Sequence, residues 1–176
     1  MNKINILYKK FNNIKDEWGG VDKKILKAVV ALNLIGLNTS GSCEGHLNKN
    51  SPLPWIKISP PLKAKNKDNV IKDYELKIRK LLKLFYKNKK NINDKTKLVI
   101  TKGNYGFWLH PNKNLFKKWR KFVLKNVSFY KNKKNLYKIK KEFILPKINK
   151  KELDLYQKEF NLFADFILKD FLNNKK

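Results

Sequence analysis

The chain has 176 residues, of which 42 are Lys or Arg and 14 are Asp or Glu, giving a formal net charge of +28. Apolar residues make up 41% of the chain, which is enough for one sizeable core and excludes a disordered polycation. No stretch approaches the roughly 18 uncharged apolar residues of a membrane span, and we expect no signal peptide. The single Cys excludes an intramolecular disulfide. We therefore expect a cytoplasmic protein.

The positive charge is unevenly distributed along the chain. Forty of the basic residues are Lys, and Asn occurs 23 times; both have A-rich codons, so base composition accounts for part of the charge. It does not account for residues 76–141, which hold 22 basic residues and one acid, against 20 basic and 13 acidic residues in the other 110. Such a region attracts polyanions. Because Lys binds phosphate as a point charge, we expect contacts to an RNA backbone with little base readout.

Apolar periodicity predicts two helices at the start of the chain. The first covers residues 4–18, and the second, apolar on most sides, follows Asp22 as its N-cap and ends near Gly36. Residues 38–47 hold the densest cluster of small residues and are predicted to form a loop. The sequence Trp-Ile-Lys-Ile at 55–58 then predicts a short strand.

The middle of the chain predicts a helix, a hairpin and another helix. Residues 66–88 have one apolar stripe, and residues 97–101 and 105–109 read as a β-hairpin with a turn of about three residues. Pro111 is predicted to open the next helix. Lysines cover the polar faces of both helices, and we select as nucleic-acid-binding candidates Lys77, Lys80, Lys83, Lys87, Lys117, Lys118, Arg120 and Lys121.

The C-terminal part is predicted to be mainly helical. Residues 131–141 read as an exposed basic connector or a continued helix, and Asn149 with Glu152 resembles a capping box for the last helix. The order of elements predicts an α+β fold in which helices cover a small antiparallel sheet. We expect a single domain over residues 1–176, with a motif-bearing part at about 1–62, a basic part at 66–141 and a final helix at 150–173.

The motif Thr39-Ser-Gly-Ser-Cys-Glu-Gly-His46 holds the chain's only Cys and one of its two His. Three kinds of chemistry fit it. Cys43 and His46 could bind Zn²⁺ with His110 and a carboxylate such as Glu44, although no second Cys exists and we assign no metal ligands. Cys43 could be a nucleophile activated by His46 or His110. The candidate catalytic residues are therefore Cys43, Glu44, His46 and His110.

The third chemistry is anion binding by the predicted loop. Amides and hydroxyls of Ser40, Gly41, Ser42 and Gly45 would hold a phosphate, with His46 as a further donor. A purely structural interpretation stands beside all three: Cys43 as a small buried hydrophobe and the glycines as turn formers. Trp55 and Trp108 are the aromatic residues most suited to stacking on the bases of a single strand.

Two resemblances rest on this motif. The segment from Ala31 to Leu47, with Pro54-Trp55-Ile56 after it, is similar to a family of small uncharacterised bacterial proteins that share a "Gly-x-x-Thr-x-x-Ser-Cys-Glu-Gly-His" signature and a downstream Pro-Trp. The motif also resembles the Thr-Ser-Ser-Cys-Ser-Gly-Arg signature of the wybutosine-synthesis tRNA methyltransferases, with Glu44 in place of Ser and His46 in place of Arg. That second resemblance implies S-adenosylmethionine as cofactor and a tRNA substrate.

The sequence therefore leads to three hypotheses for function. The first is association with RNA, or another polyanion, through non-specific contacts to the phosphate backbone. The second is a Cys/His-dependent enzyme that modifies or hydrolyses RNA, with a methyltransferase as one form of it. The third is a protein-interaction module without chemistry, whose charge reflects base composition alone. The sequence itself identifies no cofactor and no oligomeric state.

Overall fold

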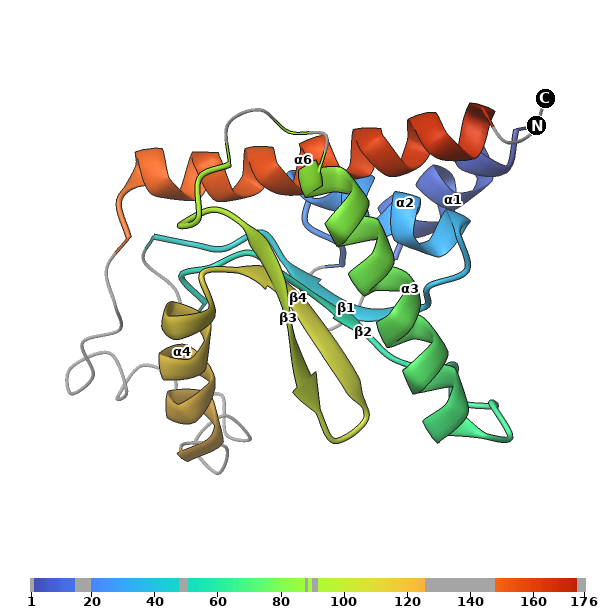
Figure 1. Cartoon of the computed structure of the whole chain (residues 1–176), viewed down its shortest axis with the longest axis horizontal. Helices are drawn as coiled ribbons and strands as arrows, with labels where there is room; N and C mark the ends of the chain where they lie inside the picture. Colours follow the sequence, from blue (N-terminus) through green and yellow to red (C-terminus); the bar gives the residue numbers. More distant parts are fainter. Residues whose placement is uncertain are drawn as a thin grey trace.

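A four-stranded antiparallel sheet lies at the centre of the protein (Figure 1). The computed structural model describes residues 2–14, 20–47, 51–87, 89, 92–125 and 148–173. Within them the strand order is β1-β2-β4-β3, with every neighbouring pair antiparallel. The strands are β1 (Thr39–Cys43), β2 (Trp55–Ile58), β3 (Leu98–Gly103) and β4 (Gly106–Pro111). Helices pack on this sheet, so the predicted α+β class is confirmed.

The helices agree well with the apolar periodicity of the sequence. Their bounds are α1 (Lys3–Asn12), α2 (Leu26–Leu34), α3 (Lys67–Lys87), α4 (Lys113–Lys125) and α6 (Lys150–Asn173). The first helix is shorter than the predicted range of residues 4–18, since α1 ends at Asn12. Trp18 and the predicted connector at 131–141 lie outside the described residues. Among the described helices, none combines the length and the apolar character that crossing a bilayer requires.

Local hydrogen bonds set the ends of two helices. At the start of α6, the Glu152 N–H donates to Asn149 Oδ1 (2.8 Å) and the Asn149 N–H donates to Glu152 Oε2 (3.0 Å), so the predicted capping box is confirmed. Gly36, with φ of +83°, follows α2 and lets the chain turn back, as predicted. The predicted cap of α2 was wrong: Ile25 holds the N-cap position, and Asp22 is bonded elsewhere.

The structure corrects the sequence prediction at β1. Residues 39–43 form a strand rather than part of a loop, paired with β2 in a register that includes Cys43 opposite Trp55. An irregularity between Thr39 and Gly41 adds one residue to β1, as in a β-bulge. The predicted hairpin is confirmed, with a tighter turn than expected, because Gly103 pairs with Gly106 and leaves two residues between them.

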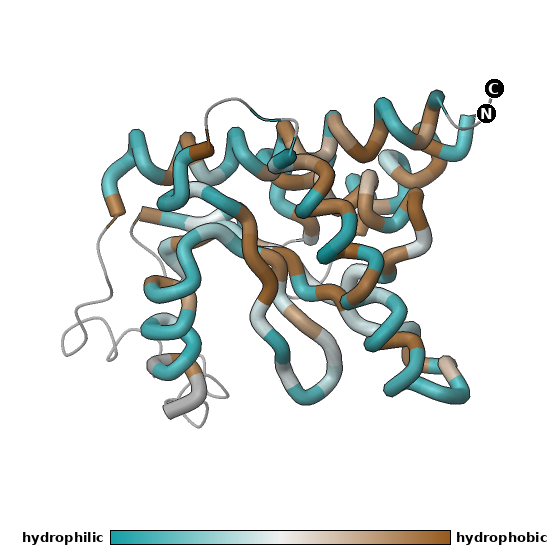
Figure 2. The backbone as a smooth tube through the Cα atoms, viewed as in Figure 1, coloured by the Kyte–Doolittle hydropathy of each residue, from teal (hydrophilic) through white to brown (hydrophobic). Residues whose placement is uncertain are grey.

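One face of the sheet forms the main core. Alternate residues of β2 and β4 point to this face, and α2, α3 and α6 cover it. Fully buried members include Ile56, Ile58, Leu109, Phe160 and Phe163. Figure 2 shows the hairpin as hydrophobic where it passes near α6 and less so toward its turn. This face contributes most of the apolar burial among the described residues, and hence most of the hydrophobic stabilisation.

The opposite face of the sheet packs against α4 in a second, smaller cluster. Phe116 of α4 is fully buried there, together with Leu53 from the segment before β2 and Leu153 and Tyr156 from the start of α6. Trp55, Trp108 and Trp119 surround it and remain partly exposed. The two faces therefore differ in kind: one is closed by three helices, and the other carries large aromatic rings near the surface.

Candidate functional sites

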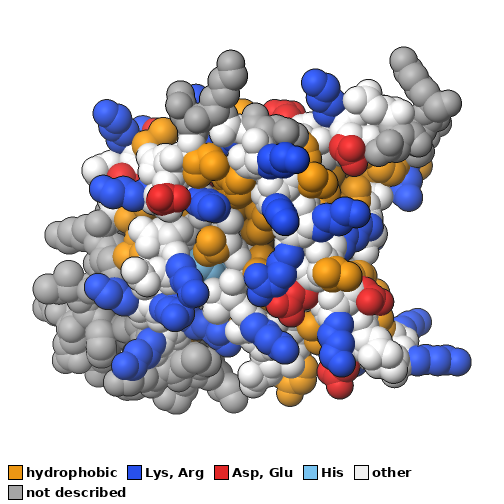
Figure 3. All heavy atoms as spheres, in the orientation of Figure 1, with side chains coloured by type: hydrophobic (Ala, Val, Ile, Leu, Met, Phe, Trp, Pro, Cys, Tyr) orange, Lys and Arg blue, Asp and Glu red, His pale blue; other side chains and the backbone are white. Residues whose placement is uncertain are grey.

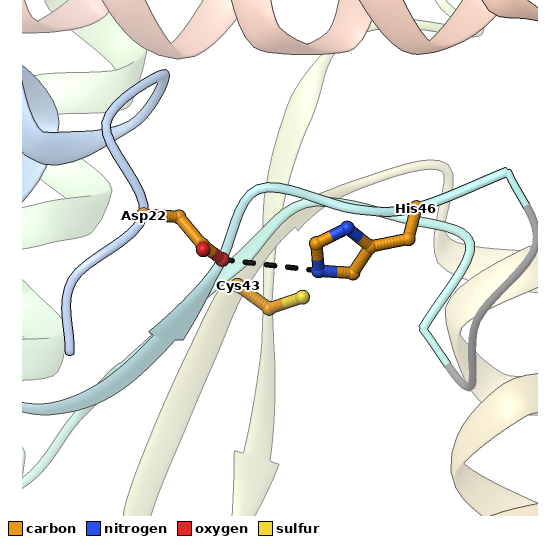
Figure 4. A group of neighbouring side chains, drawn as sticks. All are labelled: Asp22, Cys43 and His46. Atoms are coloured by element: carbon orange, nitrogen blue, oxygen red, sulfur yellow. Dashed lines mark ion pairs between the residues drawn. The ribbon is translucent and has the colours of Figure 1, made fainter. Parts of the chain in front are cut away.

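The motif is divided between a strand and the loop that follows it. Cys43 is the last residue of β1, and Glu44, Gly45 and His46 lie beyond the strand. Gly45 has φ of +78°, and a Cβ there would lie 2.8 Å from both Leu153 Cδ1 and Pro54 N. Only glycine fits this position without strain. Figure 4 shows the His46 side chain pointing toward Cys43, and the His46 N–H donates to Ser51 O (2.7 Å).

Asp22 completes a three-residue cluster with Cys43 and His46 (Figure 4). One ligand atom of each residue lies within 4.8 Å of the others, and His46 Nε2 is 4.0 Å from Asp22 Oδ2. The His46 and Asp22 side chains are 28% and 32% exposed, so the cluster is reachable from solvent. We define this group as the Asp22–Cys43–His46 cluster. Among the described residues it is the one group of this type that could hold a metal ion.

Hydrogen bonds fix the two segments that build this cluster. The Glu44 N–H donates to Asp22 Oδ2 (2.9 Å), and the Lys24 N–H donates to Glu44 Oε2 (3.2 Å). From α6, Gln157 donates to Glu44 O (2.8 Å) and Asn161 donates to Lys24 O (3.1 Å). The segments around Lys24 and Glu44, 20 residues apart in the sequence, are thus both held against α6. The carboxylate of Glu44, one of the candidate catalytic residues, accepts a hydrogen bond from the backbone of Lys24.

The Cys43 thiol is half-buried and accepts hydrogen bonds. The Gly45 N–H donates to Cys43 Sγ at 3.4 Å. Burial raises the pKa of the Cys43 thiol above its ordinary value, and the hydrogen bonds from the Gly45 N–H and the Ser51 hydroxyl oppose this rise only in part. The free protein therefore holds a thiol rather than a thiolate at neutral pH. This state does not favour an activated nucleophile.

The structure places His110 apart from the motif. Cys43 pairs with Trp55 across β1 and β2, and the β2–β4 register sets Trp55 next to His110, so about two strand spacings, roughly 10 Å, separate the two residues. The His110 ring is fully buried and stacks on Phe116 with centroids 3.7 Å apart. Its nitrogens lie 2.8 Å from Thr101 Oγ1 and 2.9 Å from Pro111 O. His110 therefore belongs to the α4 cluster.

Burial also determines the charge state of His110. Desolvation lowers the pKa of the imidazole to about 4, although the hydrogen bond to Pro111 O opposes the shift. The ring is neutral at physiological pH. A buried neutral ring with both nitrogens bonded serves packing rather than proton transfer at the motif.

The predicted anion-binding loop is not formed as expected. Ser40, Gly41 and Ser42 lie on β1, and Gly45 is the member that falls in a loop. A Cβ at Gly41 would be 3.5 Å from the Trp55 ring, an ordinary contact. Three of the four predicted residues therefore lie on a strand rather than in the loop that the prediction assumed.

The predicted nucleic-acid-binding residues divide between two helices. On α3, Lys80, Lys83 and Lys87 are exposed, while Lys77 donates to Ile35 O at the end of α2. On α4, Lys117, Lys118 and Lys121 are exposed, and Arg120 is half-buried. The two helices lie on either side of the β3–β4 hairpin in Figure 1. The structure therefore presents two basic helix faces rather than one continuous site.

Trp108 is the point where cations from two elements meet. Lys57, paired with Trp108 across β2 and β4, holds its Nζ 5.7 Å from the ring centroid. The Arg120 guanidinium lies 4.3 Å from the same centroid and donates to Lys102 O (3.0 Å). Both distances are typical of cation–π pairs. A Cβ at Gly103 would lie 2.1 Å from the Trp108 ring, so glycine there allows the indole to lie against β3.

Acidic residues are absent from the sheet strands β2 to β4 and from α4, the elements that supply the cations near Trp108. Strands β2, β3 and β4 with α4 contain eight basic residues and no acid, whereas α6 contains four Lys and five acids. Figure 3 shows Lys and Arg spread over the visible face, with acidic side chains scattered among them. The elements that supply the cations near Trp108 therefore carry charge of one sign.

Sequence reasoning missed Asp22 and Lys57 as site residues. Asp22 was expected only as a helix cap, and no local pattern connects it with Cys43, 21 residues later. The alternation of the Trp-Ile-Lys-Ile strand could have placed Lys57 on the same face as Trp55. Comparison of the chain with protein-family models, curated proteins and solved structures finds no match. Function is therefore argued from these two sites alone.

Proposed function

We propose that the protein binds cytoplasmic RNA through phosphate-backbone contacts on the face that contains α4 and the β3–β4 hairpin. The observation that carries this proposal is the pair of cations over Trp108, which come from strands and a helix (β2, β3, β4 and α4) that contain eight basic residues and no acid. We call this region the Trp108 surface and define it by Lys57, Lys102, Trp108, Lys113, Lys117, Arg120 and Lys121. It includes three of the residues selected from sequence.

Helix geometry supports one continuous basic edge along α4. Arg120 faces the hairpin, since it contacts Trp108 and Lys102. Lys113 and Lys117 precede it by seven and three positions and so lie on the same side of the helix, with Lys121 beside them. Lys118 lies about 200° around the helix from Arg120 and is not included. A phosphate backbone that follows this edge would meet successive cations and release their counterions.

The aromatic residues make a single strand the better fit. Trp55 and Trp119 stack with centroids 6.0 Å apart beside Trp108, and all three rings are partly exposed. Grooves that combine cations with partly exposed aromatic rings bind single strands with little sequence preference. Arg120 adds a planar fork of donors that matches a phosphate. We therefore expect single-stranded RNA to bind more tightly than a duplex of the same length.

The test is RNA affinity over a salt series. Fluorescence anisotropy with labelled oligouridine would be measured for the wild type and for the triple variant Lys113→Ala, Lys117→Ala, Lys121→Ala. Each lost phosphate contact lowers the slope of log K against log salt by about 0.7 for single strands, so the triple variant should lose about 2 from the slope. Its affinity should fall more than 10-fold at low salt.

A charge-matched control separates a site from general attraction. Lys151, Lys158 and Lys169 are exposed on α6, and replacing all three by Ala removes the same charge. We expect the control to keep nearly all of the affinity. Equal losses in the two variants would show that charge acts without a defined surface. Absence of binding by the wild type at low salt would contradict the proposal altogether.

The second basic face, on α3, supplies a further comparison. The variant Lys80→Ala, Lys83→Ala, Lys87→Ala removes three exposed cations from a helix that also carries three acids. We expect it to weaken RNA binding less than the α4 variant does. A larger loss in the α3 variant would move the binding surface to the other side of the hairpin.

A further inference from the structure

We propose that Asp22, Cys43 and His46 bind one Zn²⁺ ion. The three side chains come from the segment before α2, the end of β1 and the loop after it, and their ligand atoms lie within 4.8 Å of one another. This inference is independent of RNA binding, because it concerns residues outside the Trp108 surface.

The orientation of the three groups favours a shared ion over a proton relay. In a Cys–His–carboxylate triad the thiol and the carboxylate bind different nitrogens of the imidazole. Here the Asp22 carboxylate lies nearest His46 Nε2, and Figure 4 shows the Cys43 sulfur on that same side of the ring. All three groups therefore converge on one point, which is the arrangement of ligands around a metal.

The donor set selects the type of cation. Thiolate sulfur and imidazole nitrogen prefer Zn²⁺ and related transition metals, whereas Mg²⁺ and Ca²⁺ require mainly oxygen ligands. Zn²⁺ binds sulfur at about 2.3 Å and nitrogen or oxygen at about 2.0–2.2 Å, so neighbouring ligand atoms in a tetrahedron lie about 3.5 Å apart. The ligand atoms of the three side chains are up to 4.8 Å apart, and side-chain movements of about 1 Å would shorten these distances to about 3.5 Å.

The surroundings of the cluster resemble the outer shell of a metal site. Asp22 is oriented by the Glu44 N–H, and the Gly45 N–H donates to the sulfur. Outer-shell hydrogen bonds of this kind orient metal ligands and stabilise negative charge on them. Gln157 and Asn161 of α6 anchor both ligand-bearing segments. The backbone segments that carry the ligands are therefore held in place before an ion binds.

Binding of Zn²⁺ releases one proton from the protein. The S–H bond of Cys43 breaks, its proton passes to solvent, and the thiolate sulfur forms a bond to Zn²⁺. Asp22 binds as the carboxylate and His46 as the neutral imidazole. Three protein ligands leave a fourth tetrahedral position for water, as in catalytic rather than structural zinc sites.

The experiment is zinc binding by the full chain, expressed without a polyhistidine tag and stripped with a chelator. Competition with a chromophoric chelator should give one Zn²⁺ per chain, and excess Mg²⁺ should not displace it. Because losing outer-shell partners alone costs about 10- to 100-fold in metal affinity, we expect Cys43→Ser, His46→Gln and Asp22→Asn each to weaken binding by about 100-fold or more. Asp154→Asn, an exposed carboxylate on α6, is the matched control and should bind normally.

Cobalt provides a second readout that does not depend on every variant folding. Co²⁺ bound to the wild type should show a thiolate-to-cobalt charge-transfer band, and this band should persist in Asp154→Asn. Asp22→Asn keeps the shape of the side chain and an acceptor for the Glu44 N–H, so its fold should survive. The proposal is overturned if the wild type binds no Zn²⁺, if Co²⁺ gives no thiolate band, or if Asp22→Asn binds as tightly as the wild type.

Discussion

The two faces of the sheet carry different kinds of side chains on the same strands. On the face covered by α2, α3 and α6, side chains are buried and charges are paired: Glu159 accepts from Tyr86 (2.9 Å) and Lys89 (2.5 Å). On the face covered by α4, rings are partly exposed and cations lie over Trp108 without a nearby acid in their own elements. Alternation along a strand thus separates a buried face from a face with partly exposed rings and cations, and substitutions on the two faces should have different effects.

The largest effect is expected in the main core. Phe160 is fully buried on α6, and Phe160→Ala should lower the free energy of unfolding by about 3–5 kcal/mol through lost burial and a cavity. Urea denaturation measures this change. At a temperature where the variant stays folded, RNA affinity should match the wild type. Loss of RNA binding in a folded Phe160→Ala variant would show that the two faces are not independent.

His110 should make the α4 cluster sensitive to acid. Its pKa is about 4 in the folded protein and about 6.5 when unfolded, so the unfolded state binds more protons between these values. Above about pH 6.5 the His110 ring is neutral in both states and does not lower the free energy of unfolding. As the pH drops to 4, protonation of the unfolded state lowers the free energy of unfolding by about 3 kcal/mol.

Denaturation curves of the wild type and His110→Gln at pH 7.5 and 4.5 test this difference. The variant cannot titrate at this position, so its stability should fall less between the two pH values. Equal pH dependence in both proteins would show that His110 is not buried as the neutral form. The carboxylates titrate in both chains, and the comparison removes their contribution.

Two glycines with similar backbone conformations test the packing around the motif. Gly45→Ala places a methyl group 2.8 Å from Pro54 N in a left-handed backbone, and should cost about 2–3 kcal/mol. Gly36→Ala has the same backbone preference but no atom within 4 Å of the added group, and should cost about 1 kcal/mol. Thermal denaturation would compare them. Equal losses would show that the loop at Gly45 can relax.

The smallest effect on stability is expected on the Trp108 surface. Lys113, Lys117 and Lys121 are exposed, so replacing all three by Ala should change the free energy of unfolding by less than about 0.5 kcal/mol per site. The same variant should show the large loss of RNA affinity described above. Phe160→Ala should lower stability and keep RNA affinity, and the triple Lys variant should do the opposite. The pair of results would show most clearly that the two faces act independently.

Periodicity and capping residues are sufficient to predict most of the helices. The stripe in residues 66–88 and the Asn149–Glu152 pair are local signals, and local hydrogen bonds and burial determine those elements. β1 was missed because its Ser, Gly and Cys residues have little preference for strands. It becomes a strand through pairing with β2, which is a tertiary effect.

The candidate sites could be predicted only in part. The motif identified Cys43 and His46, and the structure brings both together. Asp22 could not be found because its contact depends on the packing of two segments on α6. His110 was included because the sequence does not show that β2 lies between β1 and β4 and separates the two residues by two strand spacings.

The irregularity in β1 also affects how copies of the protein meet at high concentration. In the described sheet β1 is an outer strand, and a regular outer strand offers a repeating row of donors and acceptors to which another chain can add. The extra residue between Thr39 and Gly41 interrupts that row. At the opposite edge, β3 carries the exposed Lys102. Both edges therefore discourage strand addition, which helps a lysine-rich chain to stay free of amyloid-like assembly.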